Sequence, residues 1–171
     1  PEYHGNFMFR PAGTTPGHSF EFARLRIQHW DLSGRPDNSA LVEARQLIDT
    51  ALNDAWLPEG GFCYTLDKKG NIKTRDRFWW PVTEAIGAIS VLQRVDPRPD
   101  DEVWYRKLWE FANEYLIDHT HGGWFGAIDA EDCPVETQFK GKPDIYHSLQ
   151  ASLIPLVSEV SHLHKNLREV V

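Results

Sequence analysis

Apolar and polar positions along most of the chain recur with the spacing of amphipathic helices. This spacing predicts five helices, with boundaries at 16–32, 37–57, 81–94, 100–119 and 143–165. Two short stretches rich in aromatic residues, 62–66 and 124–128, are expected to be extended. The pattern therefore predicts an all-α protein with short β-hairpin-like loops between its helices.

The predicted helices are of two kinds. Segments 81–94 and 145–157 are apolar around most of their circumference, whereas 37–57 and 100–119 carry charges on a broad face. A helix that is apolar all round is expected to be buried, and one with a charged face is expected to meet solvent. The alternation predicts inner helices that are covered by outer ones.

The chain also repeats itself. An offset of 62 aligns Gly60-Gly61-Phe62 with Gly122-Gly123-Trp124, Asp67 with Asp129, and Pro81 with Pro143. In each copy a helix ends near the two glycines, an extended stretch follows, and a proline opens the next helix. Helical hairpins repeating at this period indicate an (α/α)6 toroid, and a closed ring of six would need roughly 370 residues.

The chain would then form about half of such a ring, as one partial domain. An open half-ring leaves the apolar flanks of its inner helices exposed, so we expect a missing segment, a partner such as a second copy of the chain, or poor solubility. The sequence begins Pro1-Glu2-Tyr3, without an initiator methionine or a signal peptide, which suggests a piece of a longer protein.

Composition narrows the possible partners. The chain has 171 residues, 41% of them hydrophobic, and a net charge of −7 with scattered basic residues, which argues against nucleic acid. No run is long and apolar enough to suggest a membrane span. Cys63 and Cys133 lie far apart without a CxxC partner, so neither a disulfide framework nor a zinc site is indicated, and a reducing cytoplasm is the expected location.

Two histidines at helix entries are candidates for proton transfer. Pro16 and Gly17 place His18 in a first helical turn, and Glu21 follows one turn later on the same face. The helix N-terminus disfavours the imidazolium and the carboxylate favours it, so the pair suits a group that both takes and gives protons. A capping histidine beside a solvated glutamate is the alternative. His147 interrupts the head of an apolar helix, and it is either functional or a hydrogen-bonded core histidine.

An aromatic cluster could form a sugar platform. Trp79 and Trp80 precede the helix that carries Glu84, and indole rings stack on sugar faces while a carboxylate takes their hydroxyls. A tryptophan-rich core corner is the alternative. Arg10 could fold over the site as a clamp, although the residue pattern favours a solvated loop arginine. The chain contains no HExxH, P-loop, GxGxxG or GxSxG pattern, and no metal or cofactor is predicted.

Five motifs together resemble one family. They are PGHSFEFARL at 16–25, GGFCYTLD at 60–67, RFWWPVTEAIGA at 77–88, GGWFGAID at 122–129 and KPDIYHSLQA at 142–151. In this order they are similar to the N-acylglucosamine 2-epimerase family, whose members fold as (α/α)6 barrels. The resemblance implies that residues 1–171 are the C-terminal half of such a barrel.

The DxYHxxQ pattern, Asp144 to Gln150, is similar to the branch of mannose isomerases and sulfoquinovose isomerase-like enzymes. The resemblance implies that His18 and His147 are the acid/base pair. It further implies that the monosaccharide site is lined by Glu21, Arg10, Trp79, Trp80, Glu84 and Gln150. The implied reaction interconverts an aldose such as mannose with its ketose through a cis-enediolate, without a cofactor. A sugar 2-epimerase and a non-catalytic sugar-binding or scaffold half-barrel remain alternatives.

Overall fold

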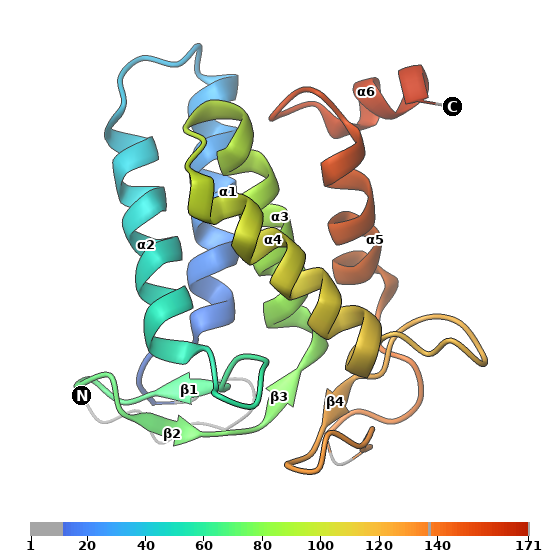
Figure 1. The fold of residues 1–171 in the computed structure, drawn as a ribbon. Helices are drawn as coiled ribbons and strands as arrows, with labels where there is room; N and C mark the ends of the chain where they lie inside the picture. Colours follow the sequence, from blue (N-terminus) through green and yellow to red (C-terminus); the bar gives the residue numbers. More distant parts are fainter. Residues whose placement is uncertain (1–11, 137, 171) are drawn as a thin grey trace.

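The structure, a computed structural model, describes residues 12–136 and 138–170, which include six α-helices (Figure 1). The helices are α1 (Pro16–Leu32), α2 (Ser39–Ala55), α3 (Trp79–Val95), α4 (Pro99–Phe111), α5 (Ile145–Leu153) and α6 (Leu163–Val170). A π-helical turn at Ala112–Leu116 continues α4, and a 3-10 turn at Ile154–Leu156 continues α5. The strands are β1 (Thr65–Leu66), β2 (Ile72–Thr74), β3 (Arg77–Phe78) and β4 (Ala127–Ile128).

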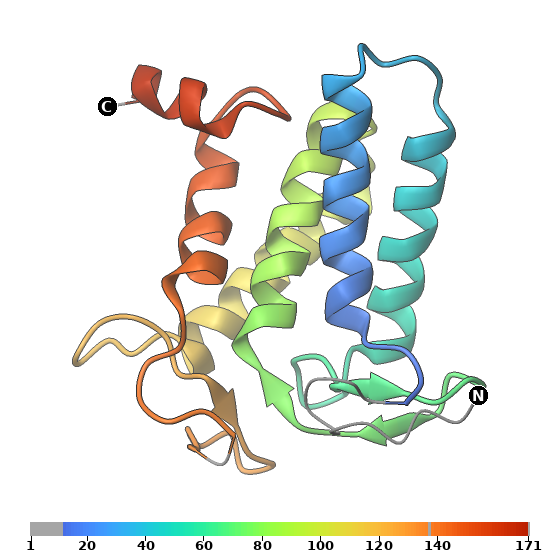
Figure 2. The same cartoon turned by 180° about the vertical axis from the view of Figure 1, so that it is seen from behind.

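Helices α1, α3 and α5 lie side by side and form an inner layer. Each begins at the end of the molecule that carries the strands (Figure 2). Outside this inner layer, α2 packs against α1 and α4 packs against α3. The predicted division into inner and outer helices is therefore confirmed for 81–94, 37–57 and 100–119.

The short strands link the repeated units at this end. β1 pairs with β2 in one antiparallel ladder, and β3 pairs with β4 in another through Arg77–Ile128 and Phe78–Ala127. β1 and β4 lie inside the stretches that were predicted to be extended. β2 and β3 were not predicted, because their few residues show no alternation of their own.

The internal repeat is present in three dimensions. Asp67 in the first copy and Asp129 in the second each use Oδ1 to accept backbone N–H bonds from the residues two and four positions later. Such aspartate turns reverse the chain tightly because the carboxylate satisfies amides that no strand partner can reach. The same local chemistry thus turns the chain before α3 and before α5.

The inner layer is open at both edges. Phe22 and Leu25 on α1, and Ile145 and Leu149 on α5, are exposed although they are large and apolar. The expectation that an open layer leaves apolar flanks uncovered is confirmed.

The prediction of one continuous helix over 143–165 is wrong. α5 ends at Leu153, a 3-10 turn contains Pro155, and Val157 is extended before α6 begins. Proline lacks the N–H that an α-helix needs and clashes with the preceding turn, so the apolar periodicity on either side belongs to separate segments. His162 has a φ of 61°, which places a further break immediately before α6.

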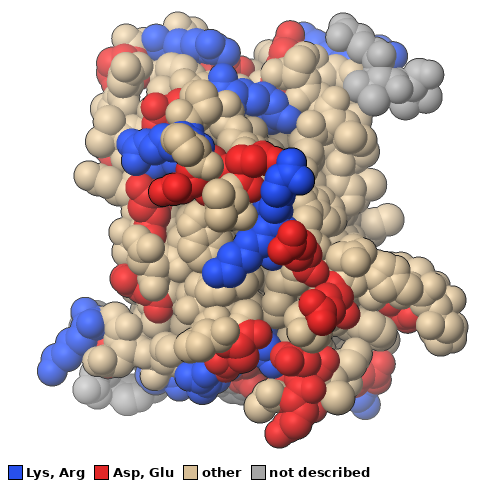
Figure 3. All heavy atoms as spheres, in the orientation of Figure 1, with Lys and Arg blue, Asp and Glu red and all other residues tan. Residues whose placement is uncertain are grey.

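Several surface features agree with the composition. Among the described residues, no helix has both the length and the apolar character needed to cross a bilayer. On the face that carries α2 and α4, acidic and basic side chains are intermingled (Figure 3). That face lacks the single-signed basic surface that nucleic-acid binding requires. Cys63 is buried, Cys133 is exposed, and both are free.

Candidate active site

The first turns of α1, α3 and α5 converge at the end of the molecule that carries the strands. They bring His18, Trp80 and His147 to one hollow of about 380 Å³. Its lining is rich in aromatic and titratable side chains: His18, Glu21, Tyr64, Trp79, Trp80, Phe139, Asp144, Tyr146 and His147. A concave apolar surface with a few convergent polar groups is typical of a small-molecule site.

Trp80 lies between the two histidines. Its ring centroid is 5.0 Å from that of His18 and 5.9 Å from that of His147, with tilted ring planes in both cases. Gly17 permits this arrangement, because a Cβ at that position would lie 2.3 Å from an indole carbon of Trp80. The glycine in the first turn of α1 thus lets the indole approach the helix backbone and stand beside both imidazoles.

The His147 ring is fixed from beneath by Glu84. Nδ1 of His147 is 2.9 Å from Oε1 of Glu84, and Gln150 Nε2 donates to the same oxygen at 3.1 Å. Glu84 is 0% exposed and belongs to α3, whereas His147 and Gln150 belong to α5. The Asp144 carboxylate also caps α5 by accepting the backbone N–H of His147.

Burial alone would raise the pKa of Glu84, but the hydrogen bond from His147 and the nearby charge of Arg24 more than offset it, so the pKa lies below its usual value. Glu84 is therefore a carboxylate that only accepts hydrogen bonds. The facing Nδ1 of His147 must then carry the ring proton when the imidazole is neutral. Nε2 is left as the ring atom able to accept a proton.

His18 and Glu21 form a looser pair. His18 is exposed, Glu21 is half-buried, and both line the hollow. No hydrogen bond joins these two described side chains. The imidazole of His18 instead rests against Trp80, with its exposed edge open to whatever enters the hollow.

The structure separates the predicted site residues into three groups. His18, Glu21, Trp79, Trp80 and His147 line the hollow. Glu84 and Gln150 lie behind His147 and bond to each other. Arg10 lies outside the described residues, so its predicted role as a clamp stays a prediction.

The full burial of Glu84 does not fit its expected role as a ligand for sugar hydroxyls. It lies one turn into α3, between α1 and α5, where Arg24 and His147 take up both of its oxygens. Trp79 and Trp80 are likewise in the first turn of α3 and largely buried, rather than in a loop before it. The exposed edges of these rings line the hollow. The Glu84 carboxylate does not line it and is hydrogen-bonded to His147.

Sequence reasoning missed Arg24. This residue is 3% exposed and bonds to Glu84 through Nε and Nη2. The signal was present, because Arg24 lies four residues after Phe20 and three before Ile27, on the apolar face of α1. A charge on a buried face requires a partner, and Glu84, the only acidic residue of α3, was the matching group.

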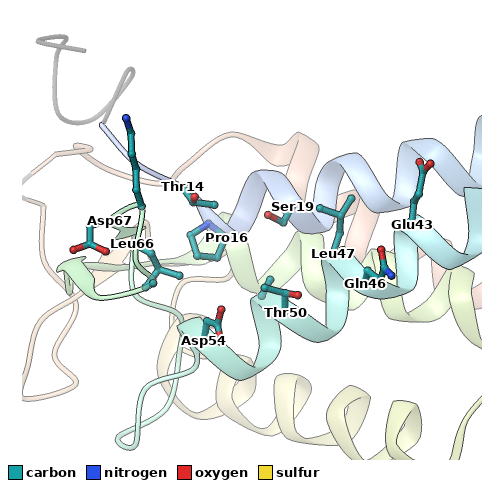
Figure 4. Close-up of a pocket in the computed structure, with 13 residues that line it drawn as sticks. Thr14, Pro16, Ser19, Glu43, Gln46, Leu47, Thr50, Asp54, Leu66 and Asp67 are labelled. Carbon is teal, nitrogen blue, oxygen red and sulfur yellow. The ribbon is translucent and has the colours of Figure 1, made fainter. Parts of the chain in front are cut away.

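A larger hollow of about 550 Å³ lies between the N-terminal turn of α1, helix α2 and the β1–β2 hairpin (Figure 4). Its polar lining includes Ser19, Thr50, Asp54 and Asp67. Its described lining includes no imidazole and none of the hydrogen-bonded groups that surround Glu84. The smaller hollow is therefore the better candidate for proton-transfer chemistry. Among the described residues, no cluster of three or more His, Cys, Asp or Glu side chains is arranged to hold a metal ion.

Comparison with known proteins places the chain in a family. Residues 1–151 match the family profile of N-acylglucosamine 2-epimerase (GlcNAc 2-epimerase). The chain belongs to this family. A D-mannose isomerase from Pseudomonas cannabina pv. alisalensis is 39% identical over 156 residues, which are 87% of this chain and 37% of that protein.

Solved structures show the same relationship. The crystal structure of a D-mannose isomerase superposes with a TM-score of 0.80 at 30% identity, covering 87% of this chain and 38% of that one. A cellobiose 2-epimerase from Spirochaeta thermophila gives 0.72 at 24% identity, covering 84% and 37%, which shows a shared fold. The chain thus spans little more than a third of the proteins it matches.

Proposed function

We propose that this chain is the C-terminal part of a sugar isomerase that interconverts an aldose such as mannose with its ketose. The observation that carries the proposal is the His147–Glu84–Arg24 series beside the aromatic hollow. It holds one imidazole in the tautomer that a base requires. The similarity to D-mannose isomerases supports the choice of substrate class.

In the proposed reaction, Nε2 of His147 removes the proton at C2 of the open-chain aldose. The electron pair forms a cis-enediolate as the C1 carbonyl oxygen becomes negative, and His18 protonates that oxygen. Return of the carbon-bound proton to C1, with loss of the O2 proton to His18, gives the ketose. Each imidazole ends the cycle in its starting state, and no external oxidant or reductant is consumed.

The surroundings suit an open-chain sugar. The ring of Trp80 stands between the two imidazoles and offers an apolar face to carbon-bound hydrogens. Glu21, Asp144 and Tyr146 line the same hollow and could bind hydroxyl groups on the far side. Polar groups around an apolar platform fix the orientation of the sugar that such a reaction needs.

We further propose that additional helices, absent from this chain, close the ring against α1 and α5. Apolar side chains on the exposed flanks of both helices support this. The added segment would also cover the hollow and supply further groups to it. Two free cysteines are compatible with a cytoplasmic protein.

The test is proton exchange. This chain, completed by the remaining part of the barrel, is incubated with mannose in D2O, and loss of the C2 proton and formation of fructose are followed by NMR. We expect His18→Ala and His147→Ala to lose exchange by about 100-fold or more. His29→Ala, an exposed histidine at the opposite end of α1, is the matched control and should retain it.

A 2-epimerase is the second candidate, favoured by the shared fold with a cellobiose 2-epimerase. It shares the first proton abstraction and differs in returning the proton to C2. Glucose rather than fructose from mannose would establish it. Binding of mannose without any exchange in the completed protein would reject both enzymes and favour a sugar-binding half-barrel.

A further inference from the structure

Arg24 is a buried cation that is paired with the carboxylate of Glu84. Its Nε and Nη2 donate to the same oxygen of Glu84, Oε2, at 3.2 and 3.0 Å. Its Nη1 donates to the side-chain oxygen of Gln28, one turn further along α1, at 3.1 Å. Gln28 in turn donates to the carbonyl of Val160, so the guanidinium is fixed from both sides.

The two oxygens of Glu84 therefore have separate partners. Among the described residues, Oε2 receives the guanidinium of Arg24, while Oε1 receives Nδ1 of His147 and the amide of Gln150. Rotation of the carboxylate would break bonds on both sides. The arginine thus determines which oxygen faces the imidazole, although it does not itself line the hollow.

The neighbouring helix is shaped to admit this side chain. Gly87 lies on α3 one turn beyond Glu84, and a Cβ there would be 3.3 Å from Cδ and 3.7 Å from Nε of Arg24. Any larger residue would press on the aliphatic stem of the arginine. The glycine leaves the guanidinium room to reach Oε2 in its two-pronged geometry.

We propose that Arg24 is a positioning residue for proton transfer. By donating two hydrogen bonds to Oε2, Arg24 keeps Glu84 ionised and directs Oε1 at Nδ1 of His147. This leaves Nε2 of His147 as the proton-accepting atom. This inference rests on the proposed function for its role in catalysis. The arrangement itself can be measured without turnover.

Removing Arg24 should change the number of protons that the His147–Glu84 pair holds. Glu84 would remain buried without a cation, so the His147–Glu84 pair would retain one more proton, either as an imidazolium or as a neutral carboxyl. Either form takes away the free base. Among the described residues, the other charged or titratable groups that line the hollow with His147 are His18 and Glu21 from α1, Tyr64 from the segment before β1, and Asp144 and Tyr146 at the start of α5. Arg24→Met changes none of them.

The experiment is a pH titration of the 171-residue chain by 15N NMR of its histidine rings, which reports tautomer and protonation together. In the unaltered chain we expect His147 to carry its neutral-state proton on Nδ1. In Arg24→Met the His147–Glu84 pair should lose its proton at a pH about one unit higher or more. Arg24→Lys keeps the charge without the fork and should give a smaller shift.

Two further variants control for structure. Arg45 is equally buried and bonds to Asp101 between α2 and α4, so Arg45→Met disturbs a comparable ion pair away from the hollow and should leave the His147 signals unchanged. Gly87→Ala displaces Arg24 without removing it, and should shift the titration in the same direction as Arg24→Met. If Arg24→Met does not fold, Arg24→Lys and Gly87→Ala carry the test.

An unchanged tautomer and titration of His147 in folded Arg24→Met, or in both Arg24→Lys and Gly87→Ala, would overturn the proposal. In the completed barrel, the rising limb of kcat against pH should move with the NMR titration, and Arg24→Lys should recover part of the activity. If the titration shifts but the unaltered completed barrel turns over no sugar, the arrangement stands and the proposed function fails.

Discussion

Helices α3 and α5 occupy corresponding positions in the two repeats, but they are buried to very different extents. Every residue of α3 from Trp79 to Leu92 is buried, whereas in α5 only Ala151 is. α3 has α1 on one side, α5 on the other and α4 behind it. α5 packs against α3 along one flank, and Ile145 on the opposite side is 72% exposed.

The difference shows what an inner helix lacks at the edge of an open layer. Both helices are apolar around much of their circumference, so their sequences are suited to the same environment. Only α3 has that environment within this chain. The comparison also explains the location of the His147–Glu84 bond, since the fully enclosed helix supplies the buried carboxylate and the edge helix supplies the accessible imidazole.

The largest expected effect on stability comes from removing the buried charge of Glu84 in α3. Glu84→Ala leaves Arg24 buried without its carboxylate, and we expect a loss of about 3–5 kcal/mol in the free energy of unfolding. Urea denaturation followed by tryptophan fluorescence measures it. The double variant Glu84→Ala with Arg24→Met should recover part of the loss, and an equal loss in both would refute an unpaired charge as the cause.

A second prediction compares apolar truncations on the two helices. Ile86→Ala on α3 removes a fully buried side chain and should cost about 2–5 kcal/mol. Leu149→Ala on α5 removes one that is 46% exposed, and should change stability by less than about 0.5 kcal/mol. Both are measured as urea unfolding free energies of this chain.

The same two variants, measured with the rest of the barrel present, test whether added helices cover the outer flank of α5. If added helices cover the outer flank of α5, the cost of Leu149→Ala should rise toward that of Ile86→Ala. A cost for Leu149→Ala that stays near zero in the completed protein would contradict ring closure over this flank.

A third, smaller effect concerns the contact between Gly17 on α1 and the Trp80 ring on α3. In Gly17→Ala the new Cβ would meet the Trp80 ring at 2.3 Å, so the indole must move. We expect a loss of about 1–3 kcal/mol in the free energy of unfolding and a changed Trp80 environment. Gly34→Ala is a poor control because Gly34 has a positive φ. Ser19→Ala, two residues further along α1, should leave the near-ultraviolet circular dichroism unchanged.

The smallest expected effect lies in the loop before the second extended stretch. A hydrogen bond from Lys142 and backbone N–H bonds from His121 and Thr120 hold the pKa of Asp118 well below its usual range, against the opposing effect of burial. Asp118 also donates its backbone N–H to the carbonyl of Gly123. In the first repeat the corresponding bond, to the carbonyl of Gly61, is donated by Leu57, a buried apolar residue.

Because the folded pKa of Asp118 is depressed, its contribution to stability is present above the unfolded pKa of about 3.9 and is lost as the pH falls below it. Asp118→Asn should therefore lower the urea midpoint at pH 6 and reduce the difference between pH 6 and pH 3. The measurement is the midpoint at both values. An unchanged pH dependence in the variant would show that Asp118 contributes nothing to acid sensitivity.

Local patterns were sufficient for much of the helical framework. Pro16 and the periodicity after it predicted the observed bounds of α1. The repeat aligned Asp67 with Asp129, and the structure forms the same turn at both. The helix predicted over 143–165 failed because apolar spacing continued through Pro155, where the backbone could not. Periodicity reports which side chains favour burial, but it does not report a missing N–H.

Site prediction had a similar boundary. The sequence placed His18 and His147 at helix entries, and both are in first turns beside one hollow. The sequence did not reveal that Glu84 is buried behind that hollow, because a glutamate at this position fits an exposed helix face as well as a buried one. Which of these occurs depends on the helices that pack against it.

By itself, the sequence determined the repeat, the apolar character of the inner helices and the residue types capable of proton transfer, since these follow from spacing and side-chain chemistry. Only the tertiary structure decided that Arg24, Glu84 and His147, which come from three different helices, meet in one hydrogen-bonded series. A buried charge is tolerable only beside its partner, and that partner lies 60 residues away along the chain. Helix packing, rather than local propensity, brings them within bonding distance.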